Sequence, residues 1–241
     1  MLIDRKSRVP RIWSNAELAK FAPLFTGDVV NVSAWKDSDK NGSFYRTYFK
    51  NARSYSLTNY ETDAMGFQGT EGEIFLDLTA PLPPELNQKW DVAFNHTALE
   101  HIFEVETAFA NLCRMSKDIV ITVVPFLQQM HSDYGDYWRF TPTCMQKLYE
   151  KNGYKVLYSS FNSHLDASTY VFTIAARDPA AWAAKISANL DKNGIVNCFE
   201  KTWAQDHFPP MVGSNAVLNI GGHLGFHLNK LLKRLTGQKP S

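Results

Sequence analysis

The segment from residue 90 to residue 154 constrains the fold most strongly, because it combines strand-like and helix-like apolar patterns in a fixed order. Asp91-Val-Ala-Phe-Asn95 and Ile119-Val-Ile-Thr-Val-Val124 are short, mostly apolar runs that are typical of buried strands. Between them, apolar residues recur at helical spacing: Ala98, Ile102, Val105, Phe109 and Leu112. The order strand, helix, strand predicts a parallel α/β unit.

Local signals predict where these elements begin and end. Thr97 with Glu100 three residues later has the pattern of a capping box, so we expect the helix to start at Thr97. Pro125 is expected to end the second strand. Thr141-Pro142 is expected to open the next helix, and Gly153 can end it in a left-handed conformation.

Further strands and helices are predicted on both sides of this segment. The expected strands cover residues 28–33, 54–59, 73–78, 155–161 and 169–175, of which the last two form an antiparallel hairpin. The expected additional helices cover residues 15–20, 179–186 and 213–237. We therefore divide the chain into a helical lead-in (1–27), an α/β domain (28–190) and a C-terminal extension with a helix (191–241).

Charge and composition exclude several classes of protein. The formal net charge of the 241 residues is +1, which argues against a nucleic-acid-binding protein. The N-terminus lacks the apolar core of a signal peptide, and no apolar run could span a membrane, so we expect a cytoplasmic protein. The C-terminal helix leaves open a peripheral membrane contact or a protein partner. Cys113, Cys144 and Cys198 are expected to be buried, reduced thiols.

Two stretches carry a resemblance to a known family. Phe94-Asn-His-Thr-Ala-Leu-Glu-His101 resembles a segment of the class I S-adenosylmethionine-dependent methyltransferases. Val124-Pro-Phe, His131, Asp136-Tyr-Trp-Arg-Phe-Thr141 and Gly153-Tyr together resemble the pattern of the methyltransferase type 11 group. The resemblance covers roughly residues 25 to 176. It implies a Rossmann-like α/β fold: a mostly parallel seven-stranded sheet with an antiparallel last strand and helices on both faces.

The resemblance also implies S-adenosylmethionine as cofactor, bound across the carboxyl ends of the first strands. The residues expected to line its site are those at or just after these ends: Asn31, Ser33, Ala34, Asn59, Glu61, Asp77, Leu78, Asn95 and His96. Asn59 or Glu61 stands where the family holds the ribose, and Asp77 where it meets the adenine. One departure is clear, because the turn after the first strand, Ser33-Ala-Trp-Lys-Asp37, contains no glycine.

The acceptor side is expected in the loop after residue 125 and at the start of the preceding helix. His131 and His101 are candidate bases, because the pKa of a histidine is near neutral. Asp136, Tyr137 and Arg139 are candidate substrate contacts, although Asp136 and Arg139 could instead form a structural ion pair. No metal is expected, since His223 and His227 lack a third ligand.

These observations favour a methyltransferase that acts on a small polar or glycan acceptor. The resemblance suggests O-methylation in bacterial surface polysaccharide synthesis. The missing glycine turn keeps an alternative open, a non-catalytic binding or scaffold protein of the same fold with a decayed cofactor site. A dinucleotide oxidoreductase is disfavoured, because the G-x-G-x-x-G pattern is absent after the first strand.

Overall fold

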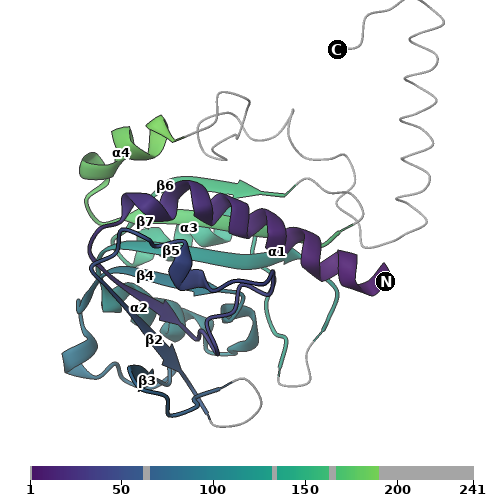
Figure 1. The fold of residues 1–241 in the computed structure, drawn as a ribbon, viewed down its shortest axis with the longest axis horizontal. Helices are drawn as coiled ribbons and strands as arrows, with labels where there is room; N and C mark the ends of the chain where they lie inside the picture. The colour runs from purple at the N-terminus through teal and green to yellow at the C-terminus, as the bar shows by residue number, and fades with distance from the viewer. Residues whose placement is uncertain (1, 62–65, 132–134, 163–166, 190–241) are drawn as a thin grey trace, which may run out of the picture. The chain divides into compact units, whose positions relative to one another are not determined.

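A computed structural model describes residues 2–61, 66–131, 135–162 and 167–189 of the chain (Figure 1). The strands are β1 Asp28–Val32, β2 Ser54–Asn59, β3 Glu73–Phe75, β4 Trp90–His96, β5 Ser116–Leu127, β6 Lys155–Phe161 and β7 Thr169–Ala176. The α-helices are α1 Leu2–Phe21, α2 Val105–Met115, α3 Pro142–Lys151 and α4 Pro179–Ala188. Short 3-10 turns are η1 Ala22–Leu24, η2 Tyr45–Thr47, η3 Pro84–Leu86 and η4 Leu99–His101. The helix expected between residues 213 and 237 lies outside the described residues.

The strands form one seven-stranded sheet in the order β3-β2-β1-β4-β5-β7-β6. The pairs β1–β2, β1–β4, β2–β3 and β4–β5 are parallel. β7 is antiparallel to both of its neighbours, β5 and β6. The predicted Rossmann-like sheet with an antiparallel last strand and a terminal hairpin is therefore confirmed.

Helices cover both faces of this sheet, as predicted. β5 shows why, because its side chains alternate between two apolar clusters: Ile119, Ile121 and Val123 belong to one, and Val120 and Val124 to the other. The first cluster packs against α1 and residues of α4, and the second packs against α2 and α3. In Figure 1, α1 crosses the near face of the sheet, while α2 and α3 lie on the far face.

The predicted start of the central helix is wrong. α2 begins at Val105, and only the 3-10 turn η4 occupies residues 99–101. Thr97 has a φ of 49°, which is not the extended conformation of an N-cap residue. Its hydroxyl accepts a hydrogen bond from Arg11 instead, at 3.0 Å. The Thr97–Glu100 capping box does not form, and the Glu100 side chain takes a different place.

Pro125 does not end the strand as predicted, because β5 continues to Leu127. β4 pairs with β5 only as far as His96 and Val123, so no ladder hydrogen bond on that side requires an N–H from residue 125. On its other side Pro125 pairs with Tyr170 of β7. Its carbonyl accepts a hydrogen bond from the Phe140 N–H at 2.8 Å, which brings the end of the following loop back to the strand.

Other boundaries agree with the prediction or differ by a few residues. The Thr141 hydroxyl accepts from the Cys144 N–H at 3.1 Å and caps α3, and Gly153 has a φ of 76° just after that helix. α1 is much longer than the helix expected at 15–20, since it reaches from Leu2 to Phe21. β1 ends one residue earlier than expected, and β3 three residues earlier. Cys113 is buried as predicted, Cys144 is exposed, and Cys198 lies outside the described residues.

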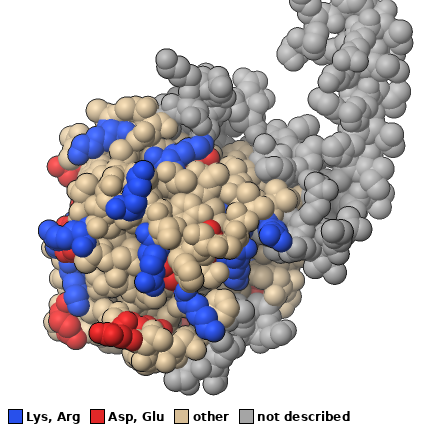
Figure 2. All heavy atoms as spheres, in the orientation of Figure 1, with Lys and Arg blue, Asp and Glu red and all other residues tan. Residues whose placement is uncertain are grey.

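The surface carries charges of both signs. In Figure 2, Lys and Arg side chains are interspersed with uncharged residues on the viewed face, and several Asp and Glu side chains lie along its lower edge. The visible face of the described residues is therefore not one continuous basic surface. None of the helices in the described part of the chain combines the length and the apolar character needed to cross a bilayer.

Candidate functional site

The candidate site lies at the edge of the sheet where the parallel strands end. β1, β2, β4 and β5 run in the same direction, so their carboxyl ends lie at one edge. In sheets of this type, ligands bind in the crevice outside that edge. The structure therefore brings the predicted polar strand ends together, and their side-chain contacts show what each one does.

The turn after β1 has an unusual backbone. Ser33, Trp35 and Asp37 have φ angles of 57°, 48° and 61°, so every second residue is left-handed. Glycine adopts this conformation without a steric cost, whereas other residues are strained in it. Three residues other than glycine therefore occupy left-handed positions in this turn. Contacts of side chains must stabilise the strained conformation.

Asn59, at the end of β2, clamps the middle of this turn. Its Oδ1 accepts from the Trp35 N–H at 2.6 Å, and its Nδ2 donates to the Trp35 carbonyl at 3.0 Å. Nδ2 also donates to the Glu73 carboxylate on β3. Glu73 is held in its ionised form by such donors, although burial opposes them, and its pKa is lowered. The Asn59 side chain therefore forms its hydrogen bonds with the turn after β1 and with the neighbouring strand β3.

Asp37 holds the end of the turn from a fully buried position. Its carboxylate accepts from Asn31 Nδ2 at 2.9 Å, from the Tyr55 hydroxyl at 2.8 Å and from Arg46 Nε at 2.8 Å. Asn31 of β1 is thus bound to the turn beside its own strand. Burial beside Asp37 raises the pKa of Tyr55 well above its usual value, so its hydroxyl remains a donor.

The end of β4 is connected to β1 and to α1. Asn95 donates to the Val32 carbonyl at 2.9 Å, while the next side chain, His96, points to the opposite face of the sheet. There His96 lies 2.9 Å from the Ser14 hydroxyl and 3.2 Å from an Arg11 nitrogen. Burial, and after it the positive charge of Arg11, lowers the pKa of His96 well below its ordinary value.

At the ends of β2 and β3, the predicted residues differ in exposure. Glu61 is solvent-exposed and left-handed, with a φ of 41°. Asp77 accepts from the Thr79 N–H at 2.8 Å and from its hydroxyl at 2.7 Å, which is the turn-capping contact. Leu78 is buried in the core. Beside them, the rings of Tyr60 and Phe75 lie 5.8 Å apart and are about half exposed.

The loop after β5 is held by an internal ion pair. Arg139 binds both oxygens of Asp136, at 2.6 and 2.8 Å, and also donates to the carbonyls of Gln128 and Gln129. Hydrogen bonds from Arg139 lower the pKa of Asp136 to about 2. The structure thus shows the structural ion pair that was the alternative to a substrate contact. Tyr137 is more than half exposed and remains available to a ligand.

This loop folds back over the segment that follows β4. The Tyr137 N–H donates to the Glu100 carbonyl at 2.8 Å, and Trp138 Nε1 donates to the Ile102 carbonyl at 3.0 Å. His101 Nδ1 lies 2.6 Å from the Gly135 carbonyl. As a result, the two predicted bases meet, and the ring centroids of His101 and His131 are 5.3 Å apart.

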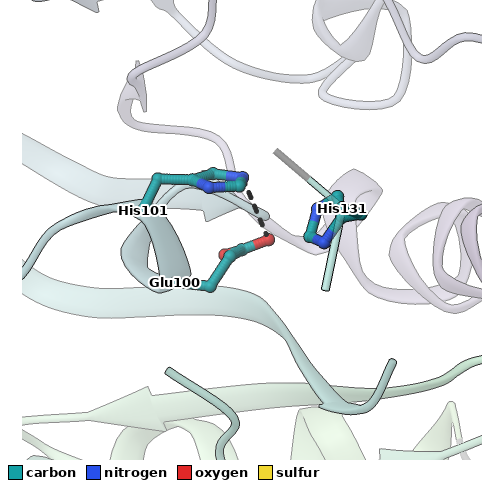
Figure 3. Close-up of side chains that lie close together, drawn as sticks. All are labelled: Glu100, His101 and His131. Carbon is teal, nitrogen blue, oxygen red and sulfur yellow. Dashed lines mark ion pairs between the residues drawn. The ribbon is translucent and has the colours of Figure 1, made fainter. Parts of the chain in front are cut away.

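Glu100 lies between these two histidines. Figure 3 shows its carboxylate directed into the space between their imidazoles, with Oε1 3.8 Å from His101 Nε2. The side chain is buried, and neither oxygen forms a hydrogen bond with the residues that the structure describes. Burial raises the pKa of Glu100 to about 8, against the opposing influence of its own backbone N–H dipole and of the Arg11 and Arg139 charges. Burial likewise lowers the pKa of His101.

Two residues of this edge were not predicted. Glu100 was assigned to the capping box, and only its adjacency to His101 could have suggested another role. Arg11 was part of the lead-in, yet it reaches Tyr45, His96 and Thr97. No signal near residue 11 indicates this, because the contacts join segments more than thirty residues apart in sequence.

Comparison with known proteins adds evidence on the fold. The sequence matches no protein-family model and no curated protein. A solved structure of a proposed methyltransferase from Bacillus halodurans is similar, with a TM-score of 0.50 and 10% identity over 67% of this chain and 97% of that chain. The fold is that of the class I methyltransferases.

Two further solved structures agree with this assignment of the fold. Magnesium protoporphyrin IX methyltransferase from Synechocystis, with bound S-adenosylmethionine, has a TM-score of 0.50 and 12% identity over 73% of this chain and 84% of that chain. A methyltransferase–activator complex from Haloferax volcanii also gives a TM-score of 0.50, with 12% identity over 69% of this chain and 90% of that chain. At these identities the likeness concerns the fold alone.

Proposed function

We propose that this protein is an S-adenosylmethionine-dependent methyltransferase that acts on a small polar acceptor. The observation that carries the proposal is the strand order of the methyltransferase fold together with a left-handed turn after β1 at the crevice edge. Such a turn brings backbone close to a ligand at this edge, as the methionine part of the cofactor requires. The similar Synechocystis enzyme was crystallised with that cofactor.

In this proposal, each part of the cofactor has its own contacts. Ser33 and Ala34 lie against the methionine part. The Asn59 side chain is already hydrogen-bonded to Trp35. The exposed carboxylate of Glu61 therefore accepts the hydrogen bonds of the ribose hydroxyls. The adenine lies near Asp77 and Leu78, where the exposed rings of Tyr60 and Phe75 offer flat faces. The backbone of Asn95 and His96 forms the floor at the end of β4, because both side chains are held by other residues.

The acceptor is proposed to lie against the loop after β5. Phe103, Tyr137 and Trp138 are exposed there by 63%, 53% and 37%, and the Phe103 ring centroid lies 5.4 Å from that of Tyr137 and 6.3 Å from that of Trp138. Aromatic faces of this kind suit sugar rings, so a glycan hydroxyl is the proposed acceptor. His131 and His101 receive the acceptor proton. Methylation in surface polysaccharide synthesis, in the cytoplasm, is the finer form of this proposal.

A second candidate function is a binding or scaffold protein without catalysis. The occupied side chains favour it, since Asn31, Asn59 and Asp37 hold the turn rather than facing the crevice. The C-terminal extension would then supply a partner or membrane contact. The two functions differ in one measurable property, which is affinity for the cofactor.

Calorimetric titration with S-adenosylmethionine and S-adenosylhomocysteine separates the two functions. The enzyme proposal predicts one site per chain. Glu61→Gln should weaken binding by roughly 10–100-fold, as the loss of a charged hydrogen bond does, whereas the exposed control Glu71→Gln should not. If neither ligand binds the folded protein at millimolar concentration, the scaffold function replaces the enzyme.

A further inference from the structure

We propose that Glu100, His101 and His131 form a binding site for a divalent transition-metal ion of the zinc type. Each of the three residues offers one ligand atom, and these atoms all lie within 4.8 Å of one another. Glu100 and His101 come from the 3-10 turn after β4, and His131 from the loop after β5 (Figure 3). The site therefore stands at the carboxyl edge of two adjacent parallel strands.

The state of the two imidazoles suits coordination. A carbonyl oxygen can only accept, so the 2.6 Å contact with the Gly135 carbonyl places the proton of His101 on Nδ1 and the lone pair on Nε2. His131 Nδ1 lies 3.2 Å from the Gln129 carbonyl and 3.4 Å from the Asp136 carboxylate, which again leaves the lone pair on Nε2. Metal-binding histidines are typically oriented in this way by a carbonyl or carboxylate.

Glu100 supplies the independent reason to expect a cation. Its carboxyl group is buried and directed between the two histidines, yet it accepts no hydrogen bond from the described part of the chain. A buried carboxylate ordinarily needs an opposite charge or several donors. The two nearby cations are engaged elsewhere, because Arg139 binds Asp136 and Arg11 donates to Tyr45 and Thr97. Neither of them donates a hydrogen bond to the Glu100 carboxyl group.

The ligand set selects the class of ion. Two imidazole nitrogens and one carboxylate oxygen are a known set for zinc, with a fourth position open to a small molecule. Magnesium and calcium prefer shells made almost wholly of oxygen atoms. Tetrahedral zinc holds its ligand atoms about 3.3 Å apart, so the three ligand atoms, which lie within 4.8 Å of one another, must approach by up to about 1.5 Å on binding.

The use of the ion rests on the proposed function. At the open position it would bind the acceptor hydroxyl and lower its pKa, so that the proton leaves to water. The oxygen would then attack the methyl carbon of the cofactor as the carbon–sulfur bond breaks, and the electron pair of that bond would remain on sulfur. With the ion bound, His101 and His131 would hold it and would no longer receive the acceptor proton directly, so the metal replaces the base role that the proposed function gives to them.

The test begins with full-length protein from which metal has been removed by a chelator. Zn²⁺ is added in a calorimeter, and Co²⁺ is added separately because its visible absorption reports tetrahedral coordination. We expect one ion per chain. Glu100→Gln and His131→Ala should each weaken binding at least tenfold, a loss that even outer contacts of metal sites produce.

Two controls locate the ion. Glu104→Gln changes an exposed acid near the site, and His223→Ala with His227→Ala removes the other histidine pair of the chain. Both should bind Zn²⁺ as the parent does. The proposal is overturned if no ion binds, if Glu100→Gln and His131→Ala leave affinity unchanged, or if the double variant abolishes binding.

The outcome is separable from the proposed function. Zn²⁺ binding without affinity for S-adenosylmethionine would retain the metal site and reject the methyltransferase. Binding of S-adenosylmethionine without binding of Zn²⁺ would retain the methyltransferase proposal and reject the metal site. Folding of each variant is checked by its thermal unfolding without metal, and Glu100→Gln, which keeps the side-chain size, remains informative if His131→Ala unfolds.

Discussion

Replacing Glu100 by methionine should stabilise the metal-free protein. The carboxyl group is 1% exposed, and neither oxygen has a hydrogen-bond partner among the described residues. A buried polar group without partners costs about 1–3 kcal/mol, and methionine has a similar length without polar oxygens. The free energy of unfolding should therefore rise by about 1–3 kcal/mol, which raises Tm by roughly 2–12 °C in a domain of this size.

Thermal and urea unfolding at pH 7 in the presence of a chelator measure this effect. The control is Glu104→Met, which changes an exposed acid four residues away and should shift stability by less than about 0.5 kcal/mol. A loss of more than 1 kcal/mol in Glu100→Met would refute the reasoning, because it would mean that the carboxyl group stabilises the fold. A gain would show that this acid is retained for a reason other than stability.

Two other perturbations follow from single contacts. Thr141→Ala removes the hydroxyl that caps α3 and should lower the free energy of unfolding by about 1 kcal/mol, measured by thermal unfolding. The control Thr143→Ala changes an exposed residue of the same helix and should lower it much less. Equal losses in the two variants would contradict the capping role. His96 has a depressed pKa when folded, so below about pH 6.5 the unfolded chain binds a proton that the folded chain excludes. Its contribution to stability is complete above that pH and is lost as pH falls, so urea unfolding of His96→Gln should depend less on pH between about 5 and 7. An unchanged slope would contradict this.

The parts of the fold that were predictable from sequence are those that local patterns determine. β2 and β6 have the predicted bounds, because each lies between turn residues and has a strong strand pattern. The α3 cap and Gly153 also form as predicted, since both interactions lie within a few residues of the helix. The mostly parallel seven-stranded sheet with an antiparallel last strand was implied by the resemblance, and the architecture bears it out.

The parts that were not predictable depend on distant contacts. Thr97 has the sequence of a capping residue, but Arg11 of α1 binds its hydroxyl from 86 positions away. Pro125 continues β5 because β4 ends beside it, which no local rule states. The proximity of Glu100 to His131 likewise depends on the loop after β5, which folds back over the segment after β4. The sequence therefore predicts which edge of the sheet carries the site, but not that Glu100, His101 and His131 lie together there.

The turn after β1 has a consequence for tolerance to substitution. In a glycine-rich turn, a side chain at a left-handed position would add steric strain, and the turn forms because glycine adopts positive φ angles without that cost. Here the left-handed positions differ, because the Asp37 carboxylate accepts from three side-chain donors, while Ser33 contributes only its backbone N–H to the Thr58 hydroxyl. Saturation mutagenesis should therefore accept glycine at residue 33 and reject it at residue 37, although both have nearly the same φ. The conformation of this turn is therefore determined by side-chain hydrogen bonds and not by glycine. A search for glycine residues cannot recognise a turn of this kind in other sequences.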